Sequence, residues 1–210
     1  MIDKESFSQL LQTPSSIVAQ PAYFQEAALR VSIEAQLHGF LGLSLSPVEI
    51  AQLPHALRMH FSSIARFWDA QKIQTHAACR LLASQLQAVN IPVLLLKGAA
   101  YIAGDKVNAK GRLISDIDIL VKKQDLALVE KTLSSVGWKA VELDDYDEKY
   151  YREWSHELPP FIHLETGATV DIHHNLLPSS AKKRIDINHI FSLKEKVGEN
   201  LYIPSEAHLI

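Results

Sequence analysis

The stretch GRLISDIDILV, residues 111–121, places two carboxylates inside an apolar run. Its apolar and β-branched residues predict a buried strand, and side chains two positions apart on a strand point to the same face. Asp116 and Asp118 should therefore stand side by side on one face of an apolar element. Neighbouring carboxylates repel each other, and each loses hydration when it is buried. The arrangement becomes favourable when a divalent cation lies between them. The alternative is that Asp116 caps a turn and Asp118 faces solvent on an edge strand.

A third acidic residue favours the metal hypothesis. Asp171 lies between Val170 and Ile172 in TVDIHH, a second apolar strand pattern. Three aspartates on two apolar strands are difficult to explain as solvated residues. Mg²⁺ prefers oxygen ligands and often shares its coordination shell with substrate phosphates. The candidate metal ligands are therefore Asp116, Asp118 and Asp171.

The turn after the apolar stretch IPVLLL is a candidate phosphate site. It reads Lys97-Gly98-Ala99, and a glycine at a strand-to-helix turn lets backbone N–H groups approach a phosphate. Lys97 adds a positive charge, and Arg112 offers a bidentate clamp. Each of these cations could equally be an ordinary surface residue.

The two parts of the chain differ in pattern. Residues 1–90 show helical apolar spacing at 22–41, 47–58 and 59–89 and no convincing strand. We expect a helical region over 1–90 and a second domain over 91–210, an α+β fold in which helices cover one side of a mixed sheet. The strands expected in it are 91–96, 112–121, 138–143, 157–165 and 168–174, with helices over 98–104 and 124–137. Ser205 is a candidate N-cap, so a further helix should begin there; it is either a short terminal helix or, as we favour, one that continues beyond residue 210.

Composition limits the partners and the compartment. The net charge of −3 gives no overall basic field, which argues against long nucleic acid as a partner. The only cysteine, Cys79, excludes an intramolecular disulfide and a cysteine zinc cluster, and its apolar neighbours indicate a core residue. No signal peptide and no apolar run of membrane-spanning length is visible, so we expect a cytoplasmic protein without a membrane partner. The oligomeric state is open.

Other polar residues near the second strand pattern are weaker candidates. His173 shares a strand face with Asp171, and His156 and Glu157 precede an apolar strand. Zinc bound by histidines is possible, but the chain has neither a cysteine pair nor a helical HxxxH to favour it. The tyrosine-rich run DDYDEKYYREW, residues 144–154, is either a lid that stacks on a ring or a solvated connector.

The order of these motifs resembles a known family. An apolar strand ending in KG, then RxxSDIDILV, then VDIHH is similar to the polymerase-beta-type nucleotidyltransferase superfamily, above all to its subgroup of uncharacterised nucleotidyltransferases. The resemblance covers roughly residues 91–210. It includes HELP at 156–159 and the terminal IPSEAHLI, and it leaves the N-terminal helices without a matching motif.

The resemblance implies a two-metal reaction. Asp116 and Asp118 would hold Mg²⁺ or Mn²⁺, and Asp171 would share one ion and help deprotonate the acceptor hydroxyl. The NTP substrate would contact four positions, which are Lys97, Gly98, Arg112 and Ser115. Ala99 departs from the serine usual after that glycine, which leaves phosphate binding to these neighbours.

Two further functions stay open beside nucleotidyl transfer to a small-molecule or protein acceptor. One is an inactive nucleotide- or partner-binding module, which Ala99 motivates. The other is a metal-dependent phosphohydrolase that uses the same carboxylates.

Overall fold

The computed structural model describes residues 2–142, 144, 155–178 and 180–208. Its contacts group the chain into two compact units, residues 1–73 with 107–113, and residues 74–106 with 114–210. The long helix α5, His55–Gln87, contributes to both units. These units differ from the expected ranges 1–90 and 91–210, and the domain boundary itself stays a prediction. None of the helices in the described part is long and apolar enough to cross a membrane.

The first unit is helical, as expected. Its elements besides α5 are α1 (Lys4–Gln12), η1 (Pro14–Ala19), α2 (Ala22–Glu34), α3 (His38–Leu43), α4 (Pro47–Gln52) and η2 (Val107–Ala109). The apolar pattern over 22–41 forms two helices, because Gln36 between them has a left-handed φ of +57°. Ser46 and Glu49 form a capping box at α4, and Pro54 separates α4 from α5.

A close backbone contact fixes residues 107–113 to the helices of this unit. A Cβ atom added at Gly39 would lie 2.1 Å from the carbonyl oxygen of Gly111. Gly111 itself has φ +70°, a conformation that side chains disfavour. Two glycines are therefore required where the segment that carries Arg112 crosses α3.

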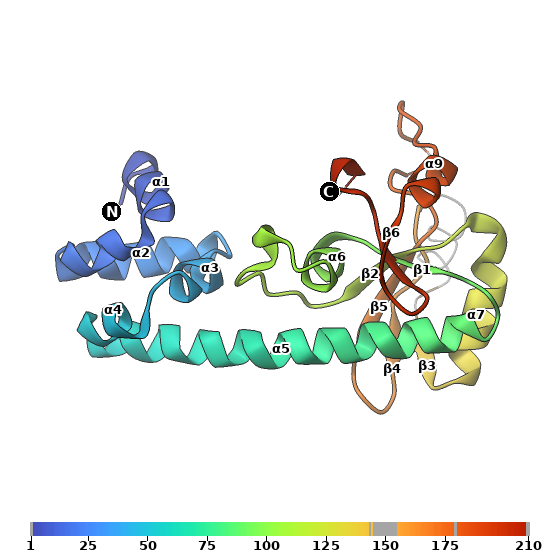
Figure 1. The fold of residues 1–210 in the computed structure, drawn as a ribbon, viewed down its shortest axis with the longest axis horizontal. Helices are drawn as coiled ribbons and strands as arrows, with labels where there is room; N and C mark the ends of the chain where they lie inside the picture. Colours follow the sequence, from blue (N-terminus) through green and yellow to red (C-terminus); the bar gives the residue numbers. More distant parts are fainter. Residues whose placement is uncertain (1, 143, 145–154, 179, 209–210) are drawn as a thin grey trace. The chain divides into compact units, whose positions relative to one another are not determined.

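The second unit contains a seven-stranded mixed sheet (Figure 1), which confirms the expected fold class. The strands are β1 (Val93–Leu95), β2 (Ile117–Leu120), β3 (Trp138–Ala140), β4 (Phe161–His163), β5 (Thr169–His173), β6 (Glu195–Gly198) and β7 (Leu201–Ile203), in the order β3-β4-β5-β2-β1-β7-β6. At the centre, β2 pairs antiparallel with β1 and parallel with β5. The sequence analysis missed β6 and β7, which are short and form one edge of the sheet.

The two faces of the sheet carry different helices. The remaining elements are α6 (Lys97–Ala103), η3 (Lys123–Asp125), α7 (Leu126–Ser135), α9 (Ile187–Ser192) and η4 (Glu206–His208). Ile117, Ile119 and alternate residues of β1 and β5 pack with buried residues of α5 and α7. Leu94 and Leu120 point to the opposite face and pack with α9. Helices α5 and α7 therefore cover one face of the sheet, and α9 adds a smaller cover to the other face, where no helix was expected.

We expect Gly39→Ala to destabilise the protein although alanine favours a helix. The new methyl group would meet backbone rather than a movable side chain, so the cost should reach about 3 kcal/mol, the upper end for overpacking. The measurement is the urea midpoint followed by circular dichroism. Gly198→Ala is the matched control, because its nearest contact is the Leu201 side chain at 3.3 Å. The control should change stability by less than about 0.5 kcal/mol, and equal effects of the two variants would contradict the close contact.

Candidate active site

The structure brings the three predicted aspartates together. Asp118 lies in β2 directly opposite Asp171 of β5 in the parallel register. Asp116 immediately precedes β2. Carboxylate oxygens of all three lie within 4.8 Å of one another. Since Ile117 and Ile119 fill the core on the other face, the alternation along β2 turns Asp118 toward the α9 face.

Asp171 is the aspartate without compensation. Its Oδ1 is buried and has no hydrogen-bond partner in the described part of the chain. Burial, together with the negative charge of Asp116 and a hydrogen bond with Asp116, raises the pKa of Asp171 to about 6. A carboxylate so placed binds either a proton or a cation.

Asp118 is compensated by two basic side chains. Lys97 Nζ lies 2.6 Å from Asp118 Oδ1, and His173 Nε2 lies 2.8 Å from the same oxygen. Burial alone would raise the pKa of Asp118, but the hydrogen bonds from His173 and Lys97 outweigh it and lower that pKa. The protein itself therefore offsets the charge of Asp118, one of the two paired aspartates.

The predicted phosphate-binding residues occupy different places. Lys97 begins α6 with φ +45°, and its ammonium group contacts Asp118 rather than open space. Gly98 is buried in the first turn of α6. Ser115 Oγ donates to Asp116 Oδ1 at 2.9 Å. Arg112 is exposed and belongs to the other compact unit, so its role in the site stays a prediction.

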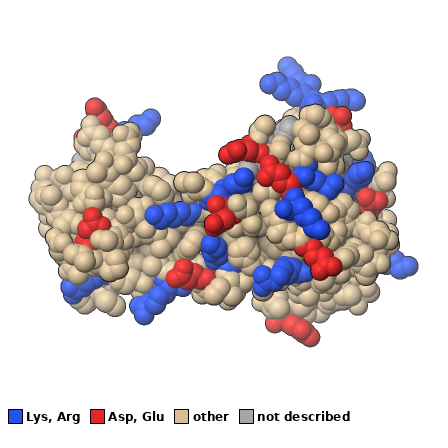
Figure 2. Space-filling model, viewed as in Figure 1, with Lys and Arg blue, Asp and Glu red and all other residues tan. Residues whose placement is uncertain are grey.

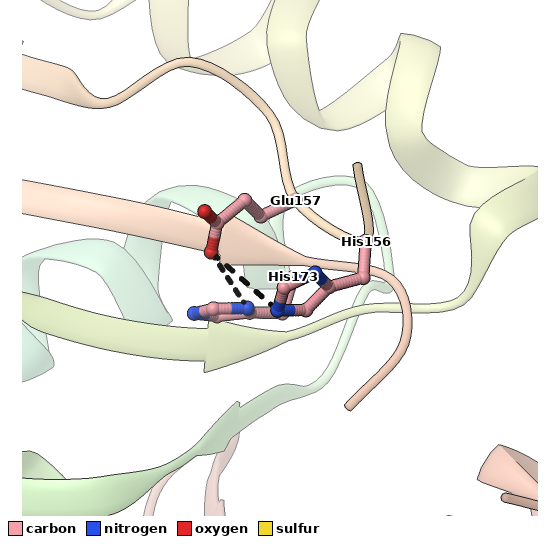
Figure 3. Close-up of side chains that lie close together, drawn as sticks. All are labelled: His156, Glu157 and His173. Atoms are coloured by element: carbon pink, nitrogen blue, oxygen red, sulfur yellow. Dashed lines mark ion pairs between the residues drawn. The ribbon is translucent and has the colours of Figure 1, made fainter. Parts of the chain in front are cut away.

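His173, which contacts Asp118, belongs to a row of three side chains with Glu157 and His156 (Figure 3). His173 Nδ1 lies 3.1 Å from Glu157 Oε2, and His156 Nε2 lies 3.9 Å from that oxygen. His173 is 2% exposed and therefore fixed in orientation. Its two ring nitrogens face the carboxylates of Asp118 and Glu157. The row thus ties Glu157 to Asp118 through one buried ring.

The sequence alone gave little weight to this row. His156 and Glu157 were secondary candidates there, and the link between His173 and Asp118 was not foreseen. The only signal in the sequence was the position of Glu157 just before an apolar strand. In the structure, Glu157 pairs with His173 as an isolated β-bridge. The run 144–154, discussed as a lid or connector, lies outside the described residues apart from Asp144. Cys79 is buried, and burial raises its thiol pKa to about 12, as expected of a core residue.

The donors identify which metal the aspartates could hold. Three carboxylates offer only oxygen ligands, and one buried oxygen among them has no hydrogen-bond partner in the described part of the chain. This set of ligands fits Mg²⁺ or Mn²⁺. His156, Glu157 and His173 also lie within 4.8 Å of one another and are chemically suitable for Zn²⁺. His173, however, already uses both nitrogens on carboxylates. Of the two groups, the aspartates therefore fit a metal ion better.

We expect Asp171→Asn to stabilise the metal-free protein at pH 7.5. The folded-state pKa of about 6 exceeds the ordinary 3.8, so the folded protein holds the proton more tightly than the unfolded chain. Ionisation of Asp171 therefore costs stability, and the loss accumulates as the pH rises from about 4 through about 6. With partial solvent screening, the gain of the variant should be on the order of 1 kcal/mol.

The measurement is the urea midpoint in EDTA across pH 4 to 7.5. The advantage of Asp171→Asn should shrink steadily as the pH falls. Glu165→Gln is the control, because it removes an exposed carboxylate from the turn that leads to β5, and it should give no such gain. A variant less stable than wild type at pH 7.5 would show that Asp171 is compensated after all.

Comparison with known proteins agrees with the motif order. A family model described as uncharacterised nucleotidyltransferase matches residues 24–210. The match therefore begins well before residue 91 and includes helices α2 to α5. Searches of curated proteins and of solved structures gave no match. Because the family model matches most of the length of the chain, the chain belongs to this family of uncharacterised nucleotidyltransferases.

Proposed function

We propose that the protein transfers an NMP group from an NTP to an acceptor hydroxyl, with Mg²⁺ or Mn²⁺ held by Asp116, Asp118 and Asp171. The observation that carries this proposal is the meeting of three carboxylates, from β2, the residue before it and β5, within 4.8 Å, one of them with a buried oxygen that has no partner among the described residues. In the reaction, a bond forms between the acceptor oxygen and the α-phosphorus. The bond from that phosphorus to the oxygen bridging the α- and β-phosphates breaks, and pyrophosphate leaves.

Metal ions, when bound, lower the pKa of the acceptor hydroxyl and neutralise charge on the transferred phosphoryl group. Asp116 and Asp118 would hold the ion on the nucleotide side. Asp118 and Asp171 would hold the ion on the acceptor side. The raised pKa of Asp171 suits a residue that also accepts the proton of the acceptor hydroxyl, since a base works best with a pKa near the working pH.

His173 and Lys97 would prepare Asp118 for this role. Both contact Oδ1, so neither of these two contacts uses Oδ2, the oxygen that would face a metal ion. His173 is buried and held by Glu157, which makes it a positioning residue. Lys97 has a side chain that is 53% exposed, so it could leave Asp118 for a phosphate oxygen when a cation takes over the charge.

Ala99 decides where phosphate contacts must come from. It is fully buried in the core on the α5 face, so this position packs against apolar residues in this chain. The contacts would then fall to Lys97, Ser115 and the backbone around Gly98, with Arg112 as a further candidate.

The charge distribution supports a compact acceptor. Figure 2 shows Lys and Arg interspersed with Asp and Glu on the face in view. Long nucleic acid requires a row of basic residues along its path, so we propose a small molecule or a protein side chain as the acceptor.

Ala99 also favours one competing function, a nucleotide-binding module without transfer activity. The presence of all three aspartates argues against it. A phosphohydrolase would use the same aspartates on water. Product analysis distinguishes the three.

We expect α-labelled NTP, incubated with Mg²⁺ and pools of hydroxyl compounds, to pass its label to an acceptor with release of pyrophosphate. Asp118→Asn should reduce transfer about 100-fold or more, because metal contacts to the phosphoryl group are worth several kcal/mol. Asp125→Asn, outside the aspartate group, should retain activity. Label released as NMP, with orthophosphate or pyrophosphate and no labelled acceptor, would identify a hydrolase. Full transfer by Asp118→Asn would contradict the site.

A further inference from the structure

A pocket of about 490 Å³ lies beside the row of His173, Glu157 and His156. Its walls come from the segment after β2, the residues before β4, the end of β5 and the start of α9. The residues that line it are Lys122, Lys123, Gln124, Ser155, His156, His174, Asn175, Leu177, Ile187 and Asn188. This volume is in the range of about 300–1,000 Å³ that small-molecule sites occupy.

The pocket is basic and has no acidic residue in its described wall. Lys122 and Lys123 carry two positive charges, and neither pairs with a carboxylate in the described part of the chain. Lys122 Nζ lies 5.7 Å from the ring centroid of Phe191, and this contact restricts the position of the ammonium group. Burial lowers the pKa of His174, and the nearby charges of Lys123 and His156 lower it further. The positive charges therefore repel one another, and no carboxylate in the described wall of the pocket offsets them.

A series of side-chain contacts connects the pocket to the aspartates. His156 lines the pocket and approaches Glu157, Glu157 contacts His173, and His173 contacts Asp118. Lys122 follows β2 at the end opposite to Asp116. Lys122 lies four positions after Asp118, so their Cα atoms are roughly 13 Å apart along an extended strand.

We propose that this pocket binds a phosphate monoester on the acceptor, which makes the acceptor a phosphorylated small molecule with a free hydroxyl. Two lysines suit a group that carries about −1.5 to −2 charge at pH 7, and Ser155 and Asn175 offer neutral donors. Leu177 and Ile187 supply an apolar wall for the carbon skeleton. The separation along β2 requires the phosphate to lie several bonds from the hydroxyl that reacts. The assignment of this ligand as the acceptor rests on the proposed function, whereas the presence of an anion site does not.

The test is isothermal titration of the full chain with inorganic phosphate and with glycerol 3-phosphate, in EDTA at pH 7. Both anions should bind at one site with millimolar or tighter affinity, and uncharged glycerol should not bind. Lys122→Gln/Lys123→Gln should weaken the binding at least tenfold. Lys182→Gln/Lys183→Gln removes the same charge from an exposed pair outside the pocket, and it should leave the binding unchanged. Equal loss in both double variants, or no saturable binding by wild type, would overturn the proposal.

A second arm separates the acceptor from the nucleotide as the source of the phosphate. A non-hydrolysable NTP analogue with Mg²⁺ should bind Lys122→Gln/Lys123→Gln as tightly as wild type. A tenfold loss would instead assign the pocket to the nucleotide phosphates and overturn the acceptor assignment. If wild type binds inorganic phosphate in this pocket but no nucleotide, the anion site stands and the proposed function fails.

Discussion

Negative charge concentrated on one sheet face is the constraint on which the site depends. Asp116, Asp118 and Asp171 meet within 4.8 Å, next to a core that excludes water. Lys97 and His173 offset only one of the three carboxylates, through Asp118 Oδ1. Asp171 keeps a buried oxygen without a partner in the described chain. The described residues therefore leave a demand for positive charge, and we propose that a divalent cation meets it.

The apolar face of the same strands fixes the positions of the aspartates. Ile119 and Ile172 lie opposite each other in the register, one position along from Asp118 and Asp171. A slip by one residue would turn the aspartates into the core and the isoleucines out of it. The packing of α5 and α7 on the apolar face thus fixes which carboxylates meet on the other. Packing energy and site geometry are set by the same pairing.

Much of the site follows from local sequence, and the remainder depends on distant contacts. Alternation along a strand was enough to predict Asp116 and Asp118 on one face, and the apolar runs predicted the strands at the centre of the sheet. Local patterns could not show that Lys97 contacts an acid 21 positions later, or that His173 contacts one 55 positions earlier. The edge strands β6 and β7 are too short to give a period-2 signal. The basic pocket is assembled from four separate segments, so no single stretch announces it.

The most direct test of the central claim is isothermal titration with a non-hydrolysable NTP analogue, with and without Mg²⁺. The account predicts that wild type binds the analogue only with Mg²⁺, for at least one of the four bases, and that Asp116→Ala/Asp118→Ala abolishes the binding while circular dichroism shows an intact fold. Binding that persists in the double variant, or a folded wild type that binds none of the four analogues with Mg²⁺, would contradict the assignment of these aspartates to a metal–nucleotide site.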